Sequence, residues 1–178
     1  MAVERAVDVE RARSDAAITA FVDEHYDRLL RLARLVCRDS IDAADAVQIG
    51  LERAWRQRST LRDEERLRPW LDRIVVREAI RIGRSRQTWL GRLFPLRPEV
   101  EWIDRPDRHD SDPATFVALR AAFQQLSPEQ RAVVALHLHL GYSVAETAVI
   151  VGAPEETVRS RLRLARHALR RELEEVRR

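Results

Sequence analysis

The chain has 178 residues, 45% of them hydrophobic, and a formal net charge of +3, so it is long enough for one domain or two small ones with buried cores. No apolar run approaches the length of a membrane span and no signal peptide precedes the first predicted helix, which favours a cytoplasmic protein without membrane insertion. The single cysteine, Cys37, excludes an intramolecular disulfide and a cysteine-based zinc site, and its apolar helical surroundings indicate a small buried side chain.

The first half of the chain has the pattern of three helices and no strand. Residues 1–14 give no periodic signal and are expected to form a flexible lead-in. From Asp15 to Val36 apolar residues recur at helical spacing, which predicts a first helix. Asp39 or Ser40 is expected to cap a second helix. The buried stripe predicted for that helix consists of Ile41, Ala44, Val47, Leu51 and Trp55.

The third predicted helix begins at Pro69 and ends in an arginine-rich stretch, which completes an all-α first domain of residues 15–87. All 32 basic residues of the chain are arginines, whose planar donors suit phosphate and guanine. In this helix they recur every three or four residues and form a basic stripe suited to phosphate groups. The stripe consists of Arg73, Arg77, Arg81 and Arg84. The alternative is an ordinary solvated helix face.

Residues 88–111 differ from the helical segments on either side. They contain several prolines and have no periodicity, and from Glu99 to Asp112 six acids stand against two arginines. An irregular segment of this length is uncommon inside a compact domain, so it predicts a linker or a functional loop. We expect an acidic linker that joins the first domain to a second all-α domain at residues 112–178.

The stretch from Ser143 to Arg171 has the pattern of a helix-turn-helix. Ser143, with Glu146 three residues later, forms a capping box at the start of the first helix. Gly152 stands where a helix end needs a positive φ, and Pro154 suits the first turn of the next helix. The pattern therefore predicts a short helix, a tight turn and a longer basic helix.

The longer helix of this motif has an apolar stripe and a polar, basic face. Val158, Leu162 and Ala165 recur at the spacing of a buried stripe. Residues on the other side suit the major groove of DNA, where arginine binds guanine or neutralises phosphate. These DNA-binding candidates are Glu156, Thr157, Arg159, Ser160 and Arg163. The alternative is a helical hairpin with solvated arginines.

Two small helical domains in this order resemble the extracytoplasmic-function group of bacterial sigma factors. The first domain resembles the family at residues 42–55, DAADAVQIGLERAW, and at residues 68–81, RPWLDRIVVREAIR. The second domain resembles it over residues 126–170, from LSPEQ to RHALR. The resemblance covers both domains and leaves out the lead-in and the linker. It implies a subunit of bacterial RNA polymerase rather than an enzyme, without catalytic residues, metal or cofactor.

In this family, the helix that matches residues 42–55 binds the clamp helices of the polymerase β′ subunit, and the β subunit is a further contact. The resemblance places Asp45 and Gln48 at the acidic and glutamine positions of that surface, with Leu51 and Glu52 beside them. Gly50 departs from the family pattern and costs about 1 kcal/mol of helix stability relative to alanine.

The resemblance also implies promoter contacts. The helix that matches residues 68–86 meets the −10 element, and Arg77 and Arg81 stand where the family often has Asn and Asp. The helix-turn-helix would bind the −35 element. The acidic linker would thread the polymerase active-site cleft and the RNA exit path, with a solvated tether as the alternative. Most relatives are held inactive by an anti-sigma factor, so the family implies such a partner here.

The residues also allow rival interpretations, namely an enzyme, a stand-alone helix-turn-helix regulator and an adaptor that binds only protein. His109-Asp110 is similar to the metal-binding pair of HD phosphohydrolases, but it has no convincing partner set. His137 and His139 point about 200° apart on a helix, so they cannot bind one metal together. The first-domain resemblance argues against a stand-alone regulator.

Overall fold

A computed structural model describes residues 2–61, 63–90 and 113–176, and within these ranges every regular element is helical. Short 3-10 turns at Arg58–Thr60 and Glu64–Arg66 precede the third helix, and a π-helical turn at Ala135–His139 follows the fifth. The described residues form seven α-helices, namely α1 (Ala2–Cys37), α2 (Ser40–Arg56), α3 (Leu67–Leu90), α4 (Pro113–Gln125), α5 (Pro128–Val134), α6 (Val144–Val151) and α7 (Glu155–Val176). The predictions of an all-α fold and of a helix-turn-helix, formed by α6 and α7, are confirmed.

The helix ends follow the predicted capping chemistry. The Asp39 side chain accepts hydrogen bonds from the backbone N–H groups of Ile41 and Asp42 and caps α2. Ser127 and Ser143 form complete capping boxes at the starts of α5 and α6. Gly152 ends α6 with φ 70°, a left-handed conformation that suits glycine.

Some element bounds differ from the sequence prediction. The helix α1 begins at Ala2, so residues 2–14 continue this helix although no periodic pattern marks them. The helix α3 begins at Leu67, two residues before Pro69, and it ends at Leu90, so residues 88–90 of the predicted linker are helical. Residues 91–111, the remainder of that linker, lie outside the described residues. The division of the chain into two domains at this segment stays a prediction.

The predicted buried stripe of α2 is wrong at Ile41, Ala44 and Trp55, which are exposed, and confirmed at Val47, which is buried. Ile41 is 66% exposed and Trp55 is 45% exposed, whereas the buried face consists of Asp42, Ala43, Ala46, Val47, Gly50 and Ala54. Small residues on this face let α2 and α3 pack closely. A Cβ added at Gly50 would lie 3.0 Å from Val75 Cγ2 and 3.3 Å from Val75 Cα, so glycine at this position permits the close approach of the two helices.

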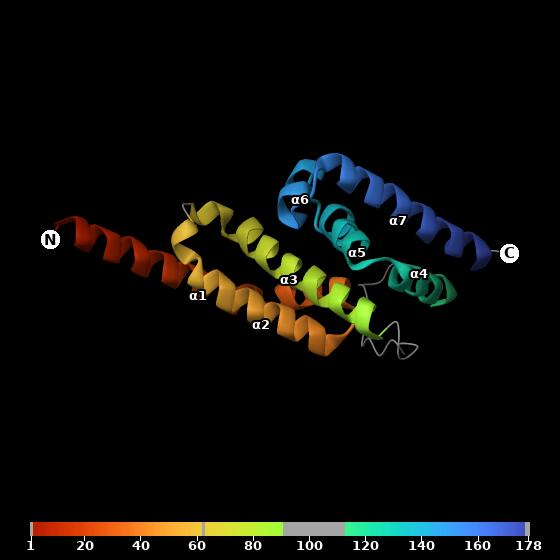
Figure 1. Cartoon of the computed structure of the whole chain (residues 1–178), viewed down its shortest axis with the longest axis horizontal. Helices are drawn as coiled ribbons and strands as arrows, with labels where there is room; N and C mark the ends of the chain where they lie inside the picture. The colour runs from red at the N-terminus through yellow and green to blue at the C-terminus, as the bar shows by residue number, and fades with distance from the viewer. Residues whose placement is uncertain (1, 62, 91–112, 177–178) are drawn as a thin grey trace.

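The helices α1, α2 and α3 lie side by side, and α5 and α6 cover the side of α3 that faces away from α2 (Figure 1). The first half of the chain, residues 2–90, contains α1 to α3, and the second half, residues 113–176, contains α4 to α7. The largest core cluster contains residues of both halves. It contains Val36, Val75 and Val76 of the first half together with Leu136 and Ile150 of the second half, all at most 2% exposed. The two halves therefore share this cluster.

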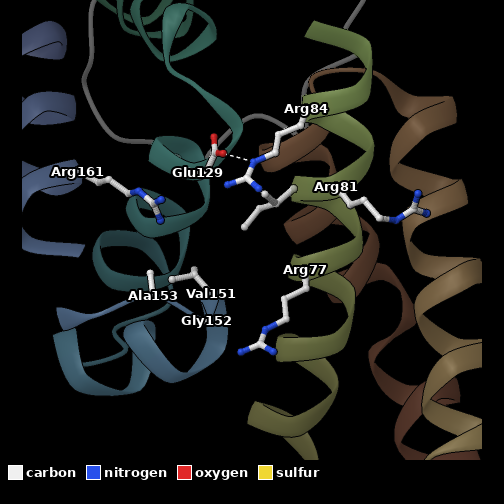
Figure 2. A pocket seen from close by; sticks show the side chains of 9 residues that line it. Arg77, Arg81, Arg84, Glu129, Val151, Gly152, Ala153 and Arg161 are labelled. Carbon is white, nitrogen blue, oxygen red and sulfur yellow. Dashed lines mark hydrogen bonds and ion pairs between the residues drawn. The ribbon is translucent and has the colours of Figure 1, made fainter. Parts of the chain in front are cut away.

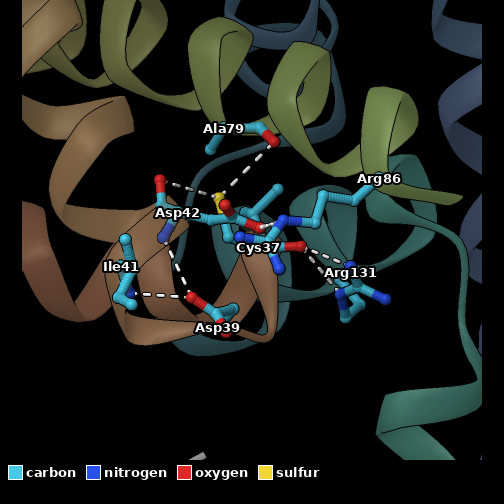
Figure 3. Close-up of polar contacts among 8 residues, drawn as sticks. Cys37, Asp39, Ile41, Asp42, Ala79, Arg86 and Arg131 are labelled. Carbon is cyan, nitrogen blue, oxygen red and sulfur yellow. Dashed lines mark hydrogen bonds and ion pairs between the residues drawn. The ribbon is translucent and has the colours of Figure 1, made fainter. Parts of the chain in front are cut away.

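Arg131 is the largest fully buried side chain and joins the two halves. Its Nε and Nη2 donate to the carbonyl oxygen of Val36 near the end of α1, with 2.9 Å for the Nε bond (Figure 3). Its Nη1 donates to the Leu126 carbonyl. Burial lowers the pKa of Arg131 to about 9, so the guanidinium is still charged at neutral pH. These bonds satisfy carbonyl groups at two helix ends that would otherwise lack donors.

Two further buried side chains, Asp72 and Cys37, lie between helices. Asp72 of α3 is fully buried and accepts hydrogen bonds from Arg28 of α1 and, at 2.7 Å, from the hydroxyl of Tyr142 in the second half. Burial of Cys37, and secondarily the charge of Asp42, raises the pKa of this thiol to about 12, so the thiol stays protonated (Figure 3). The expectation of a small buried cysteine is thus confirmed.

Candidate nucleic-acid and polymerase interfaces

The helix α2 carries an exposed polar stripe on the side opposite α3. Asp45, Gln48 and Glu52 are exposed, whereas Leu51 is half-buried and packs against two core clusters. Ile41 and Trp55 continue this stripe at the two ends, because the five exposed positions recur at spacings of four and three. Sequence reasoning placed Ile41 and Trp55 in the core. The signal that would have corrected it is the recurrence of Ala and Gly along the other face.

The arginines of α3 predicted to contact DNA are already engaged within the chain, apart from Arg73, which is exposed. Arg77 Nε donates to the Ile150 carbonyl and its Nη2 to the Val149 carbonyl, both at 2.9 Å. These acceptors lie at the carboxyl end of α6, where unpaired carbonyls and the helix dipole attract a cation. Burial, and secondarily the charge of Arg73, lowers the pKa of Arg77.

The other two arginines of the stripe pair with carboxylates. Arg81 bonds Glu78 at 2.8 Å, and the buried Glu78 also pairs with Arg53 of α2. Arg84 pairs with Glu129 of α5. Burial alone would raise the pKa of Glu129, but hydrogen bonds from its own backbone N–H and from Arg84 outweigh burial and lower it. The basic stripe is therefore present, and part of it binds the second half of the chain.

A cleft with a volume of about 410 Å³ lies between α3 and the helix-turn-helix. Arg77 and Arg84 reach into it from α3, and Arg161 reaches in from α7 (Figure 2). Glu129 supplies the acidic side chain of the lining, so cations predominate there. Gly152 forms part of the wall, and a Cβ added to it would lie 2.7 Å from Arg77 Nη2. The helix-turn-helix turn thus contacts the basic stripe directly.

The helix α7 has the predicted division into a buried and an exposed face. Val158, Leu162 and Ala165 are at most 4% exposed and pack against α4 and α5. On the opposite face Glu156, Arg159 and Arg163 are exposed, and Thr157 and Ser160 are half-buried. Arg159 pairs with Glu155 at 2.6 Å and with Glu156 at 3.6 Å, both on the same helix. Within the described ranges Arg163 makes no ion pair.

In the described part of the chain, no group of three or more His, Cys, Asp or Glu residues could hold a metal ion. His137 Nδ1 lies 2.7 Å from the Tyr142 carbonyl oxygen, a contact within the turn between α5 and α6. His109-Asp110 lies outside the described residues. No helix among those described is long and apolar enough to cross a membrane.

An all-helical chain with an exposed polar helix, a basic helix and a helix-turn-helix has the features of a DNA-binding transcription factor. The comparisons with known proteins define the class further. The family "Sigma-70 region 2" matches residues 21–89, and "Sigma-70, region 4" matches residues 116–169. The first match spans α2 and α3, and the second spans the helix-turn-helix.

Three relatives are RNA polymerase sigma factors. SigM, an extracytoplasmic-function RNA polymerase sigma factor of Mycobacterium tuberculosis, is 37% identical over 147 residues, which cover 83% of this chain and 72% of SigM. SigL of the same species is 32% identical over 170 residues and 93% of each chain. The RNA polymerase sigma-E factor of Streptomyces coelicolor is 31% identical over 153 residues, 86% of this chain and 84% of the relative.

Two solved structures share the fold. The sigma factor RpoE of Bartonella quintana, in complex with the anti-sigma factor NepR, has a TM-score of 0.63 and 26% identity, covering 87% of this chain and 97% of RpoE. CnrH, in complex with the cytosolic domain of CnrY, has a TM-score of 0.57 and 22% identity, covering 92% and 96% of the two chains.

The chain belongs to the extracytoplasmic-function sigma factors of the sigma-70 family. It is an alternative sigma factor that acts with RNA polymerase and directs promoter-specific transcription. Sigma factors are transcription initiation factors rather than enzymes. The resemblance read from the sequence is therefore confirmed, whereas the roles of single residues stay predictions.

Proposed function

We propose that the exposed stripe of α2 is the surface that binds the β′ clamp of core RNA polymerase, with the β subunit as a further contact. The observation that supports it is the exposure of Asp45, Gln48 and Glu52 on a helix whose other face is packed against α3. A helix face with this spacing suits packing against a partner helix. Leu51, next to this stripe, is half-buried and packs against the core.

We propose that α7 binds the −35 element through its exposed face. Arg159 and Arg163 are oriented away from the core, and an arginine in the major groove binds guanine or a backbone phosphate. Glu156, Thr157 and Ser160 complete the face near the start of the helix. The N-terminal part of a recognition helix is the part that reaches base edges in this motif.

We propose that α3 meets the −10 element through Arg73, Arg77, Arg81 and Arg84. Their spacing along one helix suits the regular array of backbone phosphates. In this scheme residues 15–87 and 112–178 act as two domains, joined by the predicted linker of residues 88–111, whose first three residues continue α3. RNA polymerase and promoter DNA as partners also favour action in the cytoplasm.

An anti-sigma factor is a further proposed partner. The relative RpoE was solved in complex with the anti-sigma factor NepR, and this chain shares its fold over 97% of the length of RpoE. A regulator of this kind would bind the same free chain that binds polymerase. Pull-down of the full chain with purified core polymerase and candidate regulators would measure that competition.

Transcription from a cognate promoter by purified core polymerase, with and without the chain, tests the proposed function. The double variant Asp45→Ala/Gln48→Ala should weaken core binding at least about tenfold, because truncation of interface anchors costs 1–2 kcal/mol each. Arg159→Ala/Arg163→Ala should leave core binding unchanged and lower promoter affinity about tenfold or more. Asp23→Ala and Arg31→Ala, both at exposed positions of α1 outside the proposed faces, serve as controls.

The same assay separates the rival functions. A stand-alone regulator would bind its operator without supporting transcription from core polymerase. A protein adaptor would show neither activity. Loss of core binding in the α7 variant, or unchanged core affinity in the α2 variant, would refute the residue assignments.

A further inference from the structure

The cleft between α3 and the helix-turn-helix collects positive side chains from separate parts of the chain. Its volume is about 410 Å³. Small-molecule sites typically have volumes of roughly 300–1,000 Å³. Arg77 and Arg84 of α3 and Arg161 of α7 point into the cleft (Figure 2). Glu129, which pairs with Arg84, is the only carboxylate of the described lining. Three guanidinium groups therefore converge on a space with a single acidic side chain.

Arg161 and Arg77 have N–H donors that a ligand in the cleft can use. Arg161 is half-buried and makes no hydrogen bond or ion pair with the described residues. Arg77 donates from Nε to the Ile150 carbonyl and from Nη2 to the Val149 carbonyl, which leaves its Nη1 without an acceptor among the described residues. The same two bonds neutralise the carbonyl end of α6, which would otherwise repel an anion. The cleft thus presents donors from both α3 and α7.

The rest of the lining leaves the space between these arginines open. It consists of apolar or small residues, namely Ile80, Val151, Gly152 and Ala153. Arg81 also lines the cleft, but its side chain turns toward α2 (Figure 2). A concave surface lined by one sign of charge focuses the electric field and concentrates ions of the opposite sign. The shape and charge of the cleft therefore favour a small anion.

We propose that this cleft binds a diphosphate group, either as free pyrophosphate or as part of a nucleotide. Guanidinium groups bind phosphate oxygens through pairs of parallel N–H bonds. Two linked phosphates present oxygens in several directions, so they suit donors that approach from two helices better than a single phosphate does. Arg77 would bind through its Nη1, and Arg161 through its whole guanidinium. The proposal goes beyond the proposed function and does not depend on it, because Arg161 is not among the residues proposed to bind DNA.

Calorimetric titration of the free full chain with pyrophosphate tests the proposal, in a phosphate-free buffer without divalent cations. Pyrophosphate should bind at one site per chain. Inorganic phosphate should bind at least about tenfold more weakly, because it accepts fewer charge-assisted hydrogen bonds. ADP and GDP separate the two sources of the ligand, since tighter binding of either than of pyrophosphate assigns the site to a nucleotide and weaker binding of both assigns it to the free anion. No saturable binding of pyrophosphate, ADP or GDP, or equal affinity for phosphate, would overturn the proposal.

Variants of α7 locate the site. Arg161→Ala should weaken pyrophosphate binding about tenfold or more, because it removes charge-assisted hydrogen bonds. Arg161→Lys keeps the charge without the planar fork, so its affinity should fall between those of wild type and Arg161→Ala. Arg166→Ala, at an exposed position of α7 outside the cleft, removes the same charge and should change the affinity less than about twofold, because solvent and salt screen it.

Thermal unfolding of each variant without ligand verifies that the chain is folded. Wild-type affinity of a folded Arg161→Ala chain would overturn the proposal. An equal loss of affinity in Arg161→Ala and Arg166→Ala would also overturn it, because the net charge of the chain would then account for the whole effect.

Discussion

The arginines of α3 and those of α7 have different environments, although both sets are proposed to contact the promoter. Two of the four α3 arginines, Arg77 and Arg84, bond the second half of the chain, whereas Arg81 pairs with Glu78 of its own helix. On α7, Arg159 pairs only with acids of its own helix turn, and Arg163 makes no ion pair among the described residues. The proposed −35 surface is therefore preformed, whereas the proposed −10 surface requires an exchange of partners.

The difference follows from where each helix lies. The helix α3 is central and packs against α1, α2, α5 and α6, so its polar side chains find partners on several neighbours. The helix α7 lies at the outer side of the fold, with one buried stripe and one solvated face (Figure 1). Changes at the boundary between the halves should therefore alter α3 and spare α7.

Arg131→Ala should have the largest effect on the contact between the two halves. It removes three hydrogen bonds from a fully buried side chain and leaves a cavity with unsatisfied carbonyls of Val36 and Leu126. We expect a loss of about 3 kcal/mol or more in the free energy of unfolding, measured with urea. Arg170→Ala, on the exposed face of α7, should change it by less than about 0.5 kcal/mol. A loss below about 1 kcal/mol at Arg131 would contradict its role as the link between the halves.

Gly152→Ala should have the next largest effect. Gly152 has φ 70°, which costs about 1–2 kcal/mol for a residue with a Cβ, and the new Cβ would also displace Arg77. Gly141→Ala is a matched control, because Gly141 has φ 76° and open space around its Cβ position. The difference between their unfolding free energies measures the contact of Arg77 with the turn. Equal losses would show that this contact contributes nothing.

Tyr142→Phe should have a smaller effect, about 1 kcal/mol of stability. The hydroxyl of Tyr142 donates to the buried Asp72, and burial, followed by the charge of Asp72, raises the pKa of Tyr142. Thermal unfolding should show this loss of stability, whereas promoter binding by the proposed DNA-binding face of α7 should not change. Wild-type stability of this variant would mean that the hydrogen bond adds nothing to the contact.

The ion pair of Arg84 with Glu129 should give the smallest effect, and it should depend on pH. Because the folded-state pKa of Glu129 lies below its ordinary value of 4.5, its contribution is present above that value and is lost as the pH falls through the folded pKa. Arg84 is 60% exposed, so we expect less than about 1 kcal/mol at neutral pH. Unfolding of wild type and Arg84→Ala should converge at acidic pH, and a constant difference would contradict this origin.

Local rules made much of the fold predictable. The caps at Asp39, Ser143 and Gly152 depend on a few neighbouring residues, so their sequence signals sufficed. The faces of α7 were predictable because its apolar residues are large and regularly spaced. Ile41 and Trp55 of α2 were mispredicted as buried because most of its buried side consists of alanine and glycine, which carry little hydrophobic signal.

The contact between the halves was beyond the sequence pattern. Arg131 directly precedes an apolar run, residues 132–136, and nothing local shows that its acceptor is Val36, 95 positions earlier. The partners of Arg77 are backbone carbonyls of α6, which every residue carries, so no side-chain pattern marks them. Long-range packing therefore decides which arginines of a predicted basic stripe are available to DNA.

A distance measurement between the halves tests the central claim most directly. Spin labels on cysteines introduced at Glu24 of α1 and Arg170 of α7, both exposed, report the arrangement of the halves, and the buried Cys37 stays unlabelled. Pulsed EPR should give one narrow distance distribution for the free chain and a longer distance when the chain is bound to core polymerase. The same distribution in both states would contradict the account, because α3 would then stay covered by the second half when polymerase is bound.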